Sequence, residues 1–112
     1  VLDWELVHLG DPLEDLGWFC VPAWRFGRDL PAGGFGSREA LIAAYERESG
    51  TRVDPAEVHF WEVFGTLRWG VICQFQSFAH LNGIARSVER AAIGRRVTEV
   101  ELDLLLLLDH RL

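Results

Sequence analysis

Several patterns that would assign a chemistry are missing from this chain of 112 residues. Neither a phosphate-cradling P-loop nor a G-x-S-x-G nucleophile motif is present, which argues against those two kinds of active site. The four histidines are scattered without the spacing of a zinc site, and Cys20 and Cys73 form no C-x-x-C pattern. We therefore expect two buried thiols in a reducing compartment, an arrangement favoured over a disulfide.

Excess positive charge and long apolar runs are missing as well. Lys and Arg number 11 against 17 Asp and Glu, which gives a formal net charge of −6 and a pI near 5.1. This balance argues against nucleic acid or an anionic membrane as a partner. No uninterrupted apolar run approaches the roughly 18 residues that span a bilayer, and the chain does not open like a signal peptide. We expect a cytoplasmic protein with no membrane partner.

What the chain does contain is core material and helix signals. Apolar residues make up 49% of it, with five Trp and seven Phe, enough for a single domain over residues 1–112. Helical periodicity and capping residues predict a mainly α fold of about four helices with a short N-terminal strand over residues 1–4. The helices are expected from about residue 12, between 37 and 50, from about 55 to 81, and from about 87 toward the end.

Two of these segments carry further expectations. The helix over 55–81 is apolar on most faces, so it should be surrounded by other helices, with Gly65 and Gly70 allowing close approach of a neighbour. Residues 21–36 are rich in Gly and Pro and predict a long loop, anchored by its aromatic side chains Trp24, Phe26 and Phe35.

The N-terminal stretch combines a short apolar strand with two acids, Asp3 and Glu5. A carboxylate among apolar neighbours needs a metal ion, a base or several hydrogen-bond donors. The alternatives are that Asp3 caps a turn and that Glu5 is a surface acid. Gly10-Asp11-Pro12 then predicts a helix start, with Asp11 at the N-cap and Pro12 first in the helix.

This stretch contains three short motifs: Leu2-Asp3-Trp4-Glu5, Gly10-Asp11-Pro12 and Asp15-Leu16-Gly17. In their order and spacing, these motifs resemble the metal-binding segment of the aminoglycoside/choline-type phosphotransferases. These are small-molecule kinases that share the protein-kinase fold. The resemblance implies that Asp3 holds Mg²⁺ on the phosphates of ATP or GTP, with Glu5 as a second acid beside the metal. It also implies that Asp15 braces the catalytic loop, with Gly17 where the family has Ala.

The resemblance places this chain in the C-terminal helical lobe, because the family's nucleotide lobe and H-G-D-x-x-x-x-N catalytic loop are not among its residues. The expected function of the intact protein is transfer of the γ-phosphoryl group to a hydroxyl of a small molecule, and this chain alone should be inactive. The alternative is a stand-alone helical interaction module. The five consecutive leucines at 104–108 cannot share one helix face and would favour a homo-oligomer or another partner surface.

Three other charged residues have competing interpretations. Arg25 lies between two aromatic residues, and its guanidinium group could bind a carboxylate or phosphate of a substrate. The favoured interpretation is that Arg25 packs on aromatic surface or pairs with an acid of the protein. Asp15 is either an acid of the first helical turn or, as we favour, a buried acid that accepts backbone N–H bonds. Arg68, within the most apolar helix, must have a partner, and a structural carboxylate is favoured over a ligand.

Overall fold

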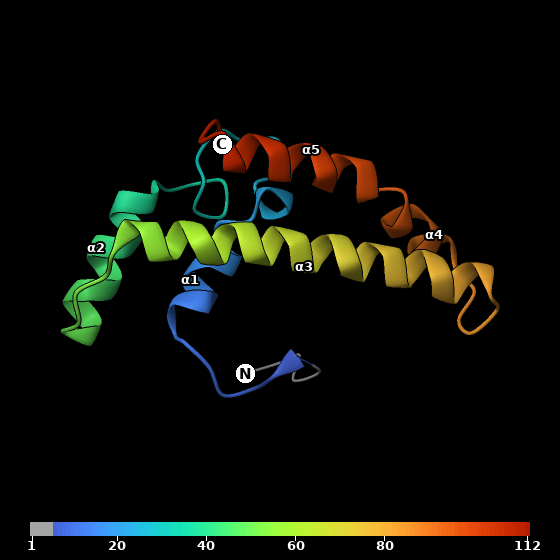
Figure 1. Ribbon diagram of the computed structural model, residues 1–112, viewed down its shortest axis with the longest axis horizontal. Coiled ribbons are helices and arrows are strands. Elements are labelled where there is room, and N and C mark those ends of the chain that lie inside the picture. Colours follow the sequence, from blue (N-terminus) through green and yellow to red (C-terminus); the bar gives the residue numbers. More distant parts are fainter. Residues whose placement is uncertain (1–5) are drawn as a thin grey trace.

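The computed structural model describes residues 6–112 and confirms a mainly α fold for that range (Figure 1). The four helical segments expected from the sequence are all present, the last of them as two helices. The expected strand at residues 1–4 lies outside the described range, and within residues 6–112 there are only isolated β-bridges and no strand. The elements are α1 (Leu13–Phe19), the 3-10 turn η2 (Pro22–Trp24), α2 (Arg38–Ser49), α3 (Pro55–Leu81), α4 (Val88–Gly94) and α5 (Val97–Leu108).

The long helix α3 is the element on which the others are arranged. In Figure 1, α5 runs along one side of α3, α1 crosses it on another side, α2 lies at its N-terminal end and α4 at its C-terminal end. The packed pairs are α1 with α3, α3 with α4 and α3 with α5. One core cluster, where α1, α2 and the start of α3 meet, consists of Leu13, Leu16, Ile42, Val53 and Val58.

Helix boundaries follow the capping residues closely. Asp54 accepts a hydrogen bond from the Ala56 N–H at 2.9 Å, and α3 begins at the proline that follows. Ser37 caps α2 in the same way, and Gly50, with a φ of 71°, ends it in the left-handed conformation. At α1 the prediction is wrong by one residue. Pro12 occupies the cap position, although the Asp11 carboxylate still accepts the Leu13 N–H at 2.9 Å.

The close approaches expected at two glycines of α3 are confirmed. A Cβ on Gly65 would lie 3.1 Å from Val21, and one on Gly70 would lie 3.0 Å from Val100 of α5. A third close approach explains why the last predicted helix is two helices. A Cβ on Gly94 would lie 2.6 Å from Ser77 Cβ of α3, so the end of α4 lies directly against α3, and the chain then turns to run back along it as α5.

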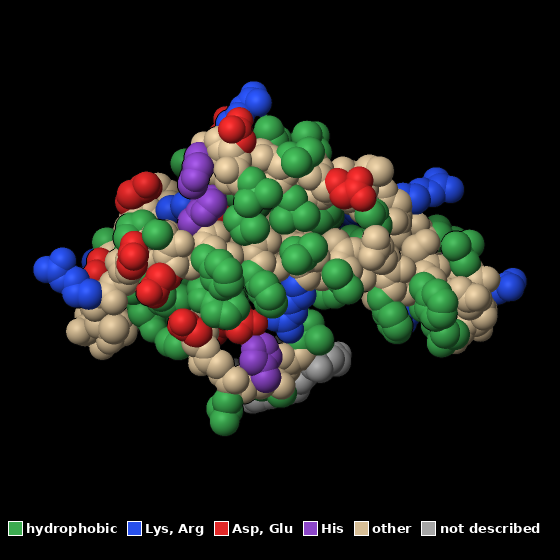
Figure 2. Space-filling view, in the orientation of Figure 1, with side chains coloured by type: hydrophobic (Ala, Val, Ile, Leu, Met, Phe, Trp, Pro, Cys, Tyr) green, Lys and Arg blue, Asp and Glu red, His purple; other side chains and the backbone are tan. Residues whose placement is uncertain are grey.

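The expectation that α3 is surrounded by helices is wrong for one of its faces. Seven apolar side chains along that face are exposed by 43–73%, and we call this set the α3 face. Its members are Phe60, Phe64, Leu67, Val71, Phe75, Phe78 and Leu81. Figure 2 shows hydrophobic side chains spread over α3 and α5 on the visible side of the molecule. Among residues 6–112, no helix combines the length and hydropathy needed to cross a membrane.

Candidate functional site

The predicted metal ligands cannot be placed on this fold. Asp3 and Glu5 lie outside the described residues, so their role in holding Mg²⁺ stays a prediction. Within residues 6–112, no three side chains among His, Cys, Asp and Glu come together as a metal site. The two N-terminal carboxylates offer hard oxygens of the type that Mg²⁺ prefers.

The segment that leads from these carboxylates into α1 is held by a chain of polar contacts. His8 Nδ1 lies 2.8 Å from the Leu6 carbonyl oxygen, and His8 Nε2 lies 2.9 Å from Glu14 Oε2. Arg68 Nη1 of α3 donates to the other oxygen of the same carboxylate, Glu14 Oε1, at 2.8 Å. This ion pair confirms that Arg68 has a structural carboxylate as its partner. The residues just after the predicted metal-binding step are thus joined to both α1 and α3.

Asp15 is exposed in the first turn of α1, so the expectation of a buried acid is wrong. Leu13, Leu16 and Gly17 form the buried face of this short helix, and helical spacing puts Asp15 on the opposite side, where it is exposed. The alternative, an acid placed favourably near the positive end of the helix dipole, fits its position. Whether Asp15 also braces a catalytic loop stays a prediction.

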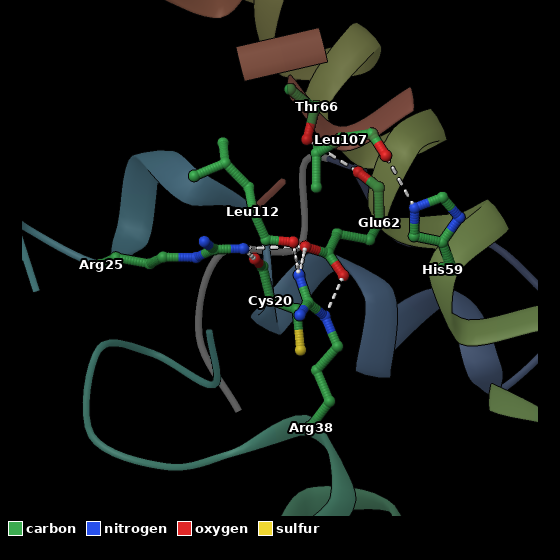
Figure 3. Close-up of polar contacts among 8 residues, drawn as sticks. All are labelled: Cys20, Arg25, Arg38, His59, Glu62, Thr66, Leu107 and Leu112. Carbon is green, nitrogen blue, oxygen red and sulfur yellow. Dashed lines mark hydrogen bonds and ion pairs between the residues drawn. The ribbon is translucent and has the colours of Figure 1, made fainter. Parts of the chain in front are cut away.

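A buried ion cluster, which the sequence interpretation missed, lies where α1, η2, α2 and α3 meet (Figure 3). Glu62 of α3 is fully buried and accepts from Arg25 Nη2 at 2.8 Å. Arg38, at the start of α2, donates to both oxygens of the same carboxylate, at 2.8 and 2.6 Å. The two guanidinium groups also donate to the carbonyl oxygens of Cys20 and Leu112. We call Glu62, Arg25 and Arg38 the Glu62 cluster.

The Glu62 cluster decides between the interpretations of Arg25. Arg25 is 5% exposed and is paired with an acid, as the favoured interpretation expected. Burial lowers the pKa of Arg25, with the nearby Glu62 carboxylate acting in the opposite direction. The hydrogen bond to Glu62 raises the pKa of Arg38. Both guanidinium groups stay charged. Arg25 Nη2 and the Arg38 donors bind the Glu62 carboxylate and main-chain oxygens, whereas Arg25 Nε is buried without a hydrogen-bond partner among residues 6–112. The contacts of Arg25 Nη2 argue for a structural role of Arg25 and against substrate binding by it.

Neither cysteine lies in an environment that would activate its thiol as a nucleophile. Cys20 and Cys73 are both buried free thiols, as expected from the sequence. Burial raises the pKa of the Cys20 thiol to about 11, with the Glu62 carboxylate adding to the effect. Burial also raises the pKa of Cys73. Since the thiolate is the reactive form, these thiols are expected to be inert in the folded protein.

The loop over residues 21–36 is only partly anchored by its aromatic side chains. Trp24 is in contact with Trp18 and with Trp69 of α3, at ring-centroid distances of 5.2 and 4.9 Å. Phe26 and Phe35, which we expected to be anchors as well, are 83% and 69% exposed. Phe26 also has a φ of 50°, a left-handed conformation that is unfavourable for a bulky residue. The loop therefore packs on α3 through Trp24 and Arg25. Phe35 contacts Phe19 edge-on at a ring-centroid distance of 5.9 Å, and Phe26 is the most exposed of its aromatic side chains.

Comparison with known proteins adds no family to this description. No protein-family model, no curated protein and no solved structure matches the chain.

Proposed function

We propose that this chain is the C-terminal helical portion of a small-molecule kinase that transfers the γ-phosphoryl group of ATP or GTP to a substrate hydroxyl in the cytoplasm. The observation that carries the proposal is the ordered match of Leu2-Asp3-Trp4-Glu5, Gly10-Asp11-Pro12 and Asp15-Leu16-Gly17 to the metal-binding segment of the aminoglycoside/choline-type phosphotransferases. In this proposal Asp3 holds Mg²⁺, and Glu5 is a second acid beside it. The metal would neutralise charge on the nucleotide phosphates when bound.

The structure supports this proposal through the way the matched segment joins the fold. Gly17 packs so closely on α3 that a Cβ there would overlap Trp61, and the Glu14–Arg68 ion pair fixes the start of the same helix. The chain just before α1 is therefore attached to a rigid helical body. Metal ligands need such a support, since a ligand set must hold its geometry when the nucleotide binds.

The α3 face is a second supporting observation. Its seven side chains leave roughly 700 Å² of apolar surface in contact with water, taking about 100 Å² each for half-exposed large side chains. This area exceeds the largest apolar patch of a typical monomer, about 300–600 Å². A helix with this surface fits a domain in which further elements pack on α3, as the helical lobe of a kinase would require.

The proposal is tested by turnover in a protein that carries this chain together with a nucleotide lobe and catalytic loop. Asp3→Ala should lower the rate of phosphoryl transfer at least about 100-fold, because loss of a group that only supports a metal ligand already costs 10–100-fold. Asp109→Ala is the matched control, since Asp109 is exposed at the end of α5, and it should leave the rate unchanged. Undiminished transfer by Asp3→Ala would overturn the metal assignment.

A second candidate function is a stand-alone helical interaction module that forms a homo-oligomer. The α3 face favours it too, since about 700 Å² is close to the roughly 800 Å² per partner of a standard interface. Leu102, Leu105 and Leu108 of α5 add further exposed apolar surface. Light scattering of this chain separates the two. A dimer whose mass does not change with protein concentration, and which Val71→Glu dissociates, would favour the interaction module. A monomer or heterogeneous aggregates would count against the module.

A further inference from the structure

His8 lies between two groups that can only accept hydrogen bonds. Its Nδ1 faces the Leu6 carbonyl oxygen at 2.8 Å, and its Nε2 faces Glu14 Oε2 at 2.9 Å. A neutral imidazole carries a hydrogen on only one of its nitrogens, so it can donate to only one of these oxygens. Both contacts are hydrogen bonds at the same time only when the ring is protonated. The geometry therefore selects the imidazolium form.

The turn between His8 and Glu14 brings their side chains close together. Gly10 lies in this turn, and a Cβ there would be 3.3 Å from His8 Cδ2 and 3.4 Å from Glu14 Oε2. A larger residue would crowd the contact between the imidazole and the carboxylate. On its other side, Glu14 accepts from Arg68, whose guanidinium carbon lies 5.6 Å from the centroid of the Trp18 ring. The contacts thus continue from the N-terminal segment through α1 to α3.

We propose that His8, Glu14 and Arg68 form a protonation-dependent clasp that positions the segment between the predicted metal ligands and α1. We call these three residues the His8 clasp. His8 is a positioning residue in this proposal, since it acts through the chain it holds. The functional consequence rests on the proposed kinase function, but the existence of the clasp does not.

The charged groups that act on His8 come from two elements. The hydrogen bond to Glu14 of α1 is the largest cause that raises the His8 pKa above 6.5, followed by the bond to the Leu6 carbonyl, while Arg68 of α3 acts in the opposite direction. A raised pKa in the folded state means that the clasp is complete below pH 6.5. It opens as the pH rises through the higher folded-state value, when one of the two hydrogen bonds of His8 is lost.

The clasp itself is tested by an NMR titration of the imidazole resonances in this chain. The His8 pKa should exceed 6.5 in the wild type and fall toward 6.5 in Glu14→Gln. Glu101→Gln, at an exposed acid on α5, is the control and should leave it unchanged. A His8 that titrates near 6.5 in all three proteins would overturn the proposal. If Glu14→Gln does not fold, the wild type alone decides, because a His8 pKa of 6.5 or below would overturn the clasp.

The positioning role is tested by the pH dependence of the KM for Mg·ATP in the full-length protein. The KM should rise as His8 loses its proton, by up to about fivefold, the upper end for an exposed ion pair, while kcat stays constant. His8→Gln should show the higher KM at every pH, and His8→Lys, a permanently charged donor, should keep the lower KM and remove the pH dependence.

The two proposals fail in different ways. Turnover with a KM that does not follow the titration of His8 would overturn the positioning role and leave the kinase function intact. Absence of turnover in the wild type would overturn the kinase function and with it the positioning role. The NMR titration would then still decide whether the clasp exists.

Discussion

Two carboxylates in this molecule make the same kind of contact in opposite environments. Glu62 bridges Arg25 and Arg38, and Glu14 bridges His8 and Arg68. The side chain of Glu62 is 0% exposed, and its two partners are guanidinium groups that never lose their charge at physiological pH. The side chain of Glu14 is 16% exposed, and its histidine partner is 48% exposed and titratable.

This difference separates a permanent contact from an adjustable one. A buried carboxylate without its partners is strongly unfavourable, so the Glu62 cluster must stay assembled for the protein to stay folded. The contact between His8 and Glu14 is open to solvent on the histidine side and contributes little free energy, so it can be lost without unfolding the chain. The Glu62 cluster joins the loop over residues 21–36 and α2 to α3. The His8 clasp joins the N-terminal segment to α1 and α3. The fixed cluster thus lies within the helical body, and the adjustable one lies next to the predicted metal ligands.

The largest expected effect comes from removing the buried carboxylate. Glu62→Ala should lower the free energy of unfolding by about 3–5 kcal/mol, because it leaves Arg25 buried without its acidic partner. Urea denaturation followed by tryptophan fluorescence measures this change. Glu48→Ala, at an exposed acid of α2, is the control and should stay within about 0.5 kcal/mol of the wild type. A loss below about 1 kcal/mol for Glu62→Ala would contradict a structural role for the cluster.

A smaller effect is expected when one cation is removed and the other remains. Arg38→Ala should destabilise by about 1–2 kcal/mol, since the Arg38 side chain is 25% exposed and Glu62 keeps its bond to Arg25. The same urea denaturation experiment gives the value. An effect of Arg38→Ala equal to that of Glu62→Ala would mean that Arg25 alone cannot hold the buried carboxylate.

The sequence predicted the elements of this fold better than the contacts between them. Ser37, Asp54 and Pro55 mark helix starts through local chemistry, and Gly50 and Asn82 mark ends, so the boundaries could be read from a few neighbouring residues. The Glu62 cluster could not be read in this way. Glu62 is 37 residues from Arg25 and 24 from Arg38, and their meeting depends on how α2 and η2 pack on α3.

One missed feature did have a signal in the sequence. Glu62 is the only acid between Val58 and Ala79 of an otherwise apolar helix, and a lone acid in such a place requires a partner. The same reasoning predicts a partner for Glu62 as it does for Arg68. The exposure of Asp15 could likewise have been predicted, because Leu13, Leu16 and Gly17 define the buried face of α1 by helical spacing.

Removing the more exposed carboxylate should have a smaller effect than either change in the Glu62 cluster. Glu14→Ala should lower the free energy of unfolding by at most about 1 kcal/mol, because Arg68 regains water when its partner is lost. The difference between the urea midpoints of the wild type and Glu14→Ala should shrink between low and moderate ionic strength, because salt screens the contacts of the clasp that only the wild type has. A loss comparable to that of Glu62→Ala would show that burial does not separate the two clusters.

The smallest expected effect is a change in the free energy of unfolding with pH that is caused by the titration of His8. Its folded-state pKa is raised, chiefly by the hydrogen bond to Glu14, so the folded state binds this proton more tightly than the unfolded state. The stability from this site is therefore complete below pH 6.5 and is lost as the pH rises through the folded-state value. The difference between the urea midpoints of the wild type and His8→Gln should accordingly shrink across that range. The partners of Glu62 are guanidinium groups that stay charged across this range. Glu62→Ala should therefore keep the same destabilisation on both sides of it, and a pH-dependent loss in that variant would remove the distinction between the fixed and the adjustable contact.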